Sequence, residues 1–373
     1  MLLLLVLALL PGAGGAGPSI TAFWAAWEAL ERARPSQAEP EVRRVAGAAA
    51  TLLSGRGVRW HASLDEPDVL VMVPLRTGSA FNDLAWRLAG ELDGLAVVFD
   101  ARRLKEEEAG ALYDEDRHRL VLSPQEIAQG RVSDYVEHEL VHARNLVALA
   151  RGADNLFMGW VRRTEQGRHL HPSYPDRFSL DELQAYAQQA RANLRELGRV
   201  DGHGDHAGTI EMIEAGSELA RVAAEVGARA TRLAAQLLAT RPLPPAAKEE
   251  HLVAGRTITA TVLRGIDGSV RFEAGALPPW VHAPPPIRRA IVEMGGAELE
   301  FIVPATRFTG GPRSDLRLVQ QRAERLAACA QAIAKALDAV RLRLEADDIA
   351  AAIDAMRALR RPTLPSATVV SCR

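Results

Sequence analysis

The residues best suited to chemistry lie in one short stretch, His138-Glu139-Leu140-Val141-His142. On a helix, two histidines four positions apart project from one face, so their imidazole nitrogens can converge on one ion. Zinc accepts neutral imidazole nitrogen readily. Glu139 points in another direction and can take a proton from a water molecule beside the ion. The spacing therefore predicts a metal site with an adjacent general base.

The flanking residues favour the helix that this site requires. Ser133 is a good N-cap, Asp134 suits the first turn, and Gly152 is a helix stop. The helix carries an apolar stripe that can pack into a core, made of Val136, Leu140, Ala143 and Val147. A charged glutamate beside two histidines in such a helix is costly unless a metal compensates it. The competing interpretation is a solvated helix with an incidental histidine pair.

The residues that precede this helix predict alternating helices and buried strands. Helical spacing of apolar residues covers 20–34, 41–53 and 81–92. Continuous apolar runs predict strands at 69–73 and 95–99. A polar turn inside 111–122 predicts a hairpin, and a further helix is expected at 180–197 after a Pro-, Gly- and His-rich loop at 152–178. The fold class predicted for this half is α+β, with a small mixed sheet.

With this arrangement, residues 65–200 resemble the zincin metallopeptidases. The resemblance implies a sheet whose edge strand precedes the His-Glu-x-x-His helix and a second helix that supplies the third zinc ligand. The edge strand would be residues 117–122, and an extended peptide substrate would add alongside it through main-chain hydrogen bonds.

The third ligand separates the zincin subgroups. Metzincins continue the motif with a glycine and a third histidine, but Asn145 and Ala148 occupy those positions here. Gluzincins take a glutamate from the later helix, and Glu182 in Asp181-Glu182-Leu183-Gln184-Ala185-Tyr186 matches that pattern. The resemblance therefore implies zinc bound by His138, His142 and Glu182, with Glu139 as the base. Both acidic residues at this helix start would also complement the helix dipole.

Other side chains compete for roles at the site. The rival third ligands are His203, Asp205 and His206, in a glycine-rich linker. Asn145 is a candidate to orient a histidine ligand. Candidates for hydrogen bonding to an oxyanion are His169, His171, Tyr174 and Tyr186.

The C-terminal half has a different pattern, with a domain boundary predicted near residue 201. Two long helices are expected at 209–239 and 314–344, each with an apolar seam. They would form a helical hairpin in residues 201–373, interrupted by a small β-containing insertion at about 245–310. The same heptads would also support self-association through these helices.

Composition and the N-terminus bound the function classes. The net charge of −2 and a charged fraction of 25% suggest neither a nucleic-acid partner nor a polybasic membrane contact. Residues 1–17 contain a short apolar run followed by small residues, typical of a secretory signal, although no Lys or Arg precedes the run. No later segment is long and apolar enough for an integral membrane span. Cys329 and Cys372 would either pair in an exported protein or leave Cys329 as a small core residue.

Together these features predict an exported zinc metallopeptidase, secreted or periplasmic, that acts on a peptide or protein substrate. One alternative is a catalytically inactive protein of zincin-like fold that binds partners through its helical half. A third is a metal hydrolase that acts on a non-peptide amide.

Overall fold

A computed structural model of the protein divides the chain into two units. The described residues are 18–153, 156, 158–163, 177–197, 207–253, 256–282, 287–307 and 311–358. Unit 1 comprises Met1–Asp114 and His118–Val136, and unit 2 comprises Glu115–Arg117 and Glu137–Arg373. Within their described residues, both units contain helices and a sheet, so the fold is mixed α+β as predicted.

Unit 1 contains a five-stranded mixed sheet in the order β1-β2-β3-β5-β4. Only β3 and β5 pair in parallel among these strands. The strands are β1 (Trp60–Ala62), β2 (Leu70–Met72), β3 (Ala96–Phe99), β4 (Leu112–Asp114) and β5 (Arg119–Val121). The helices are α1 (Pro18–Arg32), η2 (Pro35–Gln37), α2 (Ala38–Gly55), α3 (Ala80–Glu91), α4 (Ala101–Glu106) and α5 (Pro124–Gln129).

Apolar spacing and capping residues explain these elements. In α1, Phe23, Trp27 and Leu30 recur at helical intervals and are buried, and Phe23 meets Phe99 of β3 edge to face with ring centroids 6.0 Å apart. The capping of α5 is complete. Ser123 accepts a hydrogen bond from the backbone of the first turn, Pro124 occupies the first turn, and Gly130 ends the helix in the left-handed conformation.

The prediction that residues 117–122 form an edge strand is wrong. Strand β5 lies between β3 and β4, so both of its edges are hydrogen-bonded and no substrate can add to it. The hairpin itself was predicted correctly. The parallel pairing of β5 with the distant β3 is the non-local contact that the hairpin pattern did not indicate.

Unit 2 contains a seven-stranded antiparallel sheet in the order β7-β6-β12-β11-β10-β9-β8. The strands are β6 (Gly159–Arg163), β7 (Arg177–Ser179), β8 (Ala247–Val253), β9 (Arg256–Arg264), β10 (Gly268–Gly275), β11 (Ile287–Met294) and β12 (Ala297–Pro304). The helical residues are α6 (Asp134–Ala150), α7 (Leu180–Leu197), α8 (Ala207–Ala239), η3 (Ala305–Arg307), α9 (Pro312–Glu345) and α10 (Ile349–Ala358). Helix α6 begins in unit 1, and its residues from Glu137 onward belong to unit 2.

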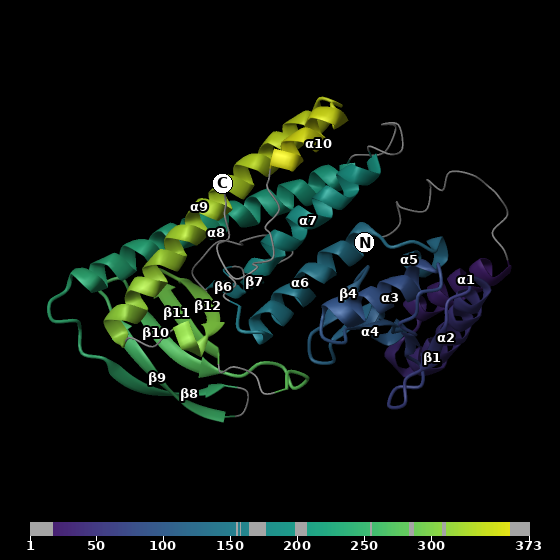
Figure 1. Ribbon diagram of the computed structural model, residues 1–373, viewed down its shortest axis with the longest axis horizontal. Coiled ribbons are helices and arrows are strands. Elements are labelled where there is room, and N and C mark those ends of the chain that lie inside the picture. Colours follow the sequence, from purple (N-terminus) through teal and green to yellow (C-terminus); the bar gives the residue numbers. More distant parts are fainter. Residues whose placement is uncertain are drawn as a thin grey trace. The chain divides into compact units, whose positions relative to one another are not determined.

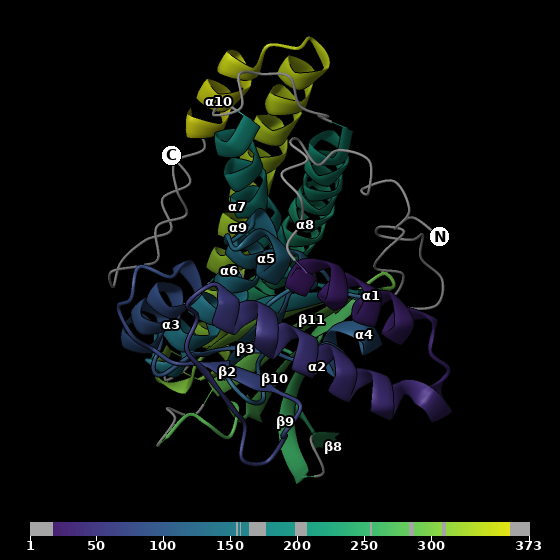
Figure 2. The ribbon, with the colours of Figure 1, turned by 90° about the vertical axis from the view of Figure 1, so that its right-hand side faces the viewer.

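The long helices α8 and α9 pack side by side within this chain (Figure 1 and Figure 2), which confirms the predicted hairpin. Gly216 of α8 lies against Leu337 of α9, whereas Gly227 lies against Ala323 and Ala327, so the two helices are antiparallel. At Gly227 the helices approach so closely that a Cβ atom would press against the α9 backbone at Ala323 and Ala327. The apolar residues of both predicted seams and those of the sheet strands form a single hydrophobic core.

The sheet of unit 2 is larger than the sequence indicated. The stretch 152–178 was predicted to be a loop, yet it contains β6 and most of β7. Strand β6 pairs with β12, which places this stretch in the same sheet as the insertion predicted at 245–310. The packing therefore divides the chain within α6, whereas the predicted boundary near 201 lies outside the described residues.

Several predicted features also lie outside the described residues: the signal at 1–17, the loose tail beyond 362 and Cys372. Cys329 is buried in α9. Among the described helices, none combines the length and apolar character needed to cross a membrane.

Candidate metal centre

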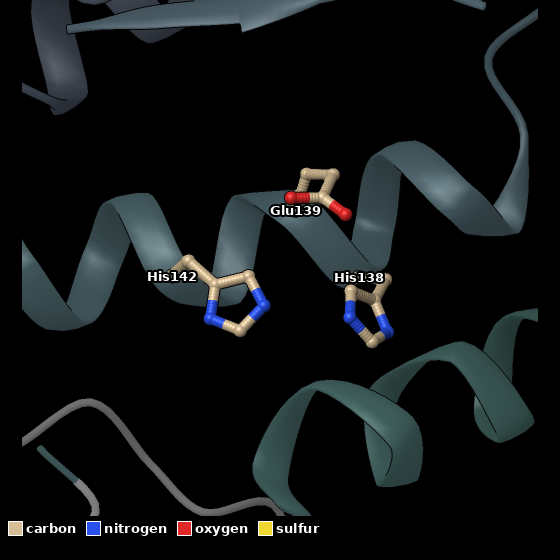
Figure 3. A group of neighbouring side chains, drawn as sticks. All are labelled: His138, Glu139 and His142. Atoms are coloured by element: carbon tan, nitrogen blue, oxygen red, sulfur yellow. The ribbon is translucent and has the colours of Figure 1, made fainter. Parts of the chain in front are cut away.

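Helix α6 presents His138 and His142 on one side (Figure 3), and their ring centroids are 5.2 Å apart. Glu139 leaves the helix in a different direction, as the spacing predicts. Each of the three side chains nevertheless offers one ligand atom within 4.8 Å of the others. In the part of the chain that the structure describes, this is the group of His, Cys, Asp and Glu side chains able to hold a metal ion.

Helix α7 brings a carboxylate to the two histidines. Glu182, in its first turn, places Oε2 3.1 Å from Nε2 of His138. Its other oxygen, Oε1, lies 3.4 Å from Nε2 of His142. Glu182, the predicted third ligand, therefore faces Nε2 of each ring. All three residues belong to unit 2.

The outer nitrogen of each ring has its own partner. Nδ1 of His142 lies 2.8 Å from Oδ2 of Asp181, and Nδ1 of His138 lies 3.0 Å from Oε1 of Gln189. Carboxylate and amide oxygens accept hydrogen bonds, so Nδ1 of each ring is placed to donate to its partner while Nε2 of each ring faces Glu182. A ring that is held through Nδ1–H in this way can bind a metal through Nε2.

Hydrogen bonds between α6 and α7 hold the two helices in register. Asn145 is buried and donates from Nδ2 to Oε1 of Gln184, 3.1 Å away, so this residue bridges the helices. Near the other end of the contact, Gln188 donates to Glu137 over 3.2 Å. The ring of Tyr186 packs edge to face on His138, with centroids 5.1 Å apart.

The electrostatics of the site favour a cation. Burial alone would lower the pKa of His142, but the charges of Asp181, Glu182 and Glu139 and the Asp181 hydrogen bond raise it to about 10. The Asp181 carboxyl is itself buried, which opposes ionisation, but the pairing with His142 lowers its pKa. The negative surroundings that retain a proton on His142 also favour a bound metal cation, which requires the neutral imidazole.

The structure brings together His138, Glu139, His142 and Glu182. The remaining candidates, His169, His171, Tyr174, His203, Asp205 and His206, lie outside the described residues. Sequence reasoning missed Gln189 and saw Asp181 only as a partner for the helix dipole. One signal was available for Gln189: it follows Glu182 by seven positions, two helical turns, and so shares its face.

No protein-family model, no curated protein and no solved structure matches this chain. The inference of function therefore depends on the geometry of this site and on the motif that forms it.

Proposed function

We propose that this chain is an exported zinc-dependent metallopeptidase of the zincin type that hydrolyses peptide bonds in a peptide or protein substrate. The observation that supports it most directly is the position of Glu182, whose carboxylate faces Nε2 of both His138 and His142. The apolar run at the N-terminus supports export.

The donor set fits zinc. Two neutral imidazole nitrogens and one carboxylate are the protein ligands of a catalytic zinc site, which keeps a fourth position open. The acceptors on both outer nitrogens, Asp181 and Gln189, give the rings the tautomer and orientation that a metal requires. His138, His142 and Glu182 would hold the ion.

When bound, zinc would lower the pKa of a water molecule toward neutrality and polarise the substrate carbonyl. Glu139 would accept the proton, because a carboxylate oxygen of this residue lies within 4.8 Å of a ring nitrogen of each histidine. The same carboxyl then delivers the proton to the leaving amine.

Metal content and hydrolysis test this proposal together. Purified full-length protein, stripped with a chelator and reloaded, is expected to take up about one zinc per chain. The reloaded protein should cleave members of a fluorogenic peptide library, whereas stripped protein and His142→Ala should not.

Two results would count against it in different ways. If reloaded wild type binds no zinc, the metal site itself is wrong. If it binds zinc but cleaves no peptide, the result favours the alternative hypothesis of a catalytically inactive zincin-like protein.

A further inference from the structure

We infer that Asp181 is a positioning residue of the metal centre: anchored to the sheet by Ser179, it holds His142 so that Nε2 faces the metal. The inference rests on the metal site of the proposed function and concerns its assembly. Asp181 is buried, and its Oδ2 lies 2.8 Å from Nδ1 of His142.

Asp181 is placed to orient a ligand and not to be one. Its Oδ2 accepts from the outer nitrogen of His142, and its Oδ1 accepts a hydrogen bond from the hydroxyl of Ser179. The adjacent residue, Glu182, is the one whose carboxylate faces Nε2 of both rings. Two consecutive carboxylates thus contact opposite sides of the same imidazole.

Ser179 connects this carboxylate to the seven-stranded sheet. It is the last residue of β7, and its Oγ also lies 3.3 Å from the carbonyl oxygen of Gly159 in β6. Gly159 pairs with Phe301 of β12, and the carbonyl of Glu300 leaves no room for a Cβ at that position. A continuous path of contacts therefore runs from the interior of the sheet to His142.

The other histidine has a weaker support. The amide oxygen of Gln189 accepts from His138, whereas His142 has a full carboxylate behind it. A carboxylate that accepts from a ligating imidazole fixes the ring and raises its basicity, and the loss of such a partner typically lowers metal affinity about 10- to 100-fold. We expect that loss for Asp181→Ala.

The chain offers a graded series and a matched control. Asp181→Asn keeps an oxygen that can accept from Nδ1 and should recover part of the affinity, and Ser179→Ala should cause a smaller loss than Asp181→Ala. Gln188→Ala removes a different α6–α7 hydrogen bond, the one to Glu137, and touches neither histidine. It should bind zinc like wild type.

The experiment measures Zn²⁺ affinity by competition with a chromogenic chelator, the absorption spectrum of Co²⁺-loaded protein, and thermal unfolding of the metal-free protein. Support would be a loss of about 10- to 100-fold in Asp181→Ala with a changed Co²⁺ spectrum, partial rescue in Asp181→Asn, and no change in Gln188→Ala. If Asp181→Ala fails to fold, the Zn²⁺ affinities and Co²⁺ spectra of Asp181→Asn and Ser179→Ala decide instead.

Wild-type affinity and spectrum in the Asp181 variants would overturn the inference while leaving the metal site intact. Equal losses in Asp181→Ala and Gln188→Ala would also overturn it, because they would reflect α6–α7 packing alone. A wild type that binds no metal would overturn this inference and the proposed function together.

Discussion

Nε2 of His138 lies 3.1 Å from Oε2 of Glu182, although 44 positions separate the two residues in the sequence. The chain between them forms β6 and β7, and these strands join a sheet whose other members lie beyond residue 246. One helix places the histidine pair by local spacing, whereas the position of the proposed third ligand, Glu182, follows strands that belong to that larger sheet.

The position of Glu182 leads to a first prediction. Glu182→Gln should lower zinc affinity strongly, because the amide is neutral and the site loses one of its carboxylate charges. Elemental analysis after dialysis should then show little zinc. Glu137→Gln, on α6 but bonded to Gln188, is the matched control and should retain the metal. Full zinc occupancy in Glu182→Gln would move the third ligand elsewhere.

Glu139 should separate binding from catalysis. Glu139→Gln leaves the nitrogen and carboxylate ligands in place, so zinc content should stay at the wild-type level. The rate of peptide hydrolysis should fall by about 10² to 10⁴, since proton transfer by a positioned base contributes that much. Steady-state kinetics on the reloaded protein measure the loss, and an unchanged kcat would remove Glu139 from the mechanism.

Glu126 in unit 1 should make stability depend on pH. Burial raises the pKa of this carboxyl to about 7 from an ordinary 4.5, despite a hydrogen bond from the backbone N–H of Ser133. Because its pKa is raised, the folded protein holds this proton more tightly than the unfolded chain does. The contribution of Glu126 to stability is therefore fully present below pH 4.5 and is lost as pH rises through 7. The free energy of unfolding should fall by about 3 kcal/mol over that window from this group.

Glu126→Gln provides the comparison, because its amide oxygen can still accept from Ser133. The variant should be less dependent on pH and more stable than wild type at pH 8. Denaturant titrations at pH 4.5 and pH 8 measure the difference between the two proteins. If the stability of both proteins depended on pH in the same way, ionisation of Glu126 would not be the cause of that dependence.

The core between α8 and α9 yields a stability prediction. Leu337 is 1% exposed and packs against Gly216, so Leu337→Ala should leave a cavity and cost about 2–5 kcal/mol. Leu342 on the same helix is 57% exposed, and Leu342→Ala should cost less than about 0.5 kcal/mol. Chemical denaturation distinguishes them, and equal costs would contradict the packing of this face.

Periodicity made much of the fold predictable. The seams of α8 and α9 and the boundaries of α7 follow from apolar spacing and stop residues, which are properties of neighbouring positions. Strand β6 was missed because a five-residue strand beside a Pro-, Gly- and His-rich stretch owes its conformation to β12, more than a hundred residues later. Local sequence carries no record of that pairing.

In the site, too, local spacing was predictable from the sequence and contacts between distant segments were not. His138, Glu139 and His142 were identifiable because their spacing alone sets their directions on a helix. The hydrogen-bond partners Asp181 and Gln189 depend on how α7 packs against α6, and only the three-dimensional structure shows which side chains meet across that contact.

The pairing of β6 with β12 means that the two halves of the sequence cannot be separated. A fragment that stops at residue 200 would keep all the proposed ligands, yet it would leave β6 and β7 without the other five strands of their sheet. The exposed edge of β6 would then favour aggregation. Conversely, an ion that binds only the folded site would stabilise the whole of unit 2, so resistance to proteolysis in the C-terminal helices should report metal occupancy at residues 138–182.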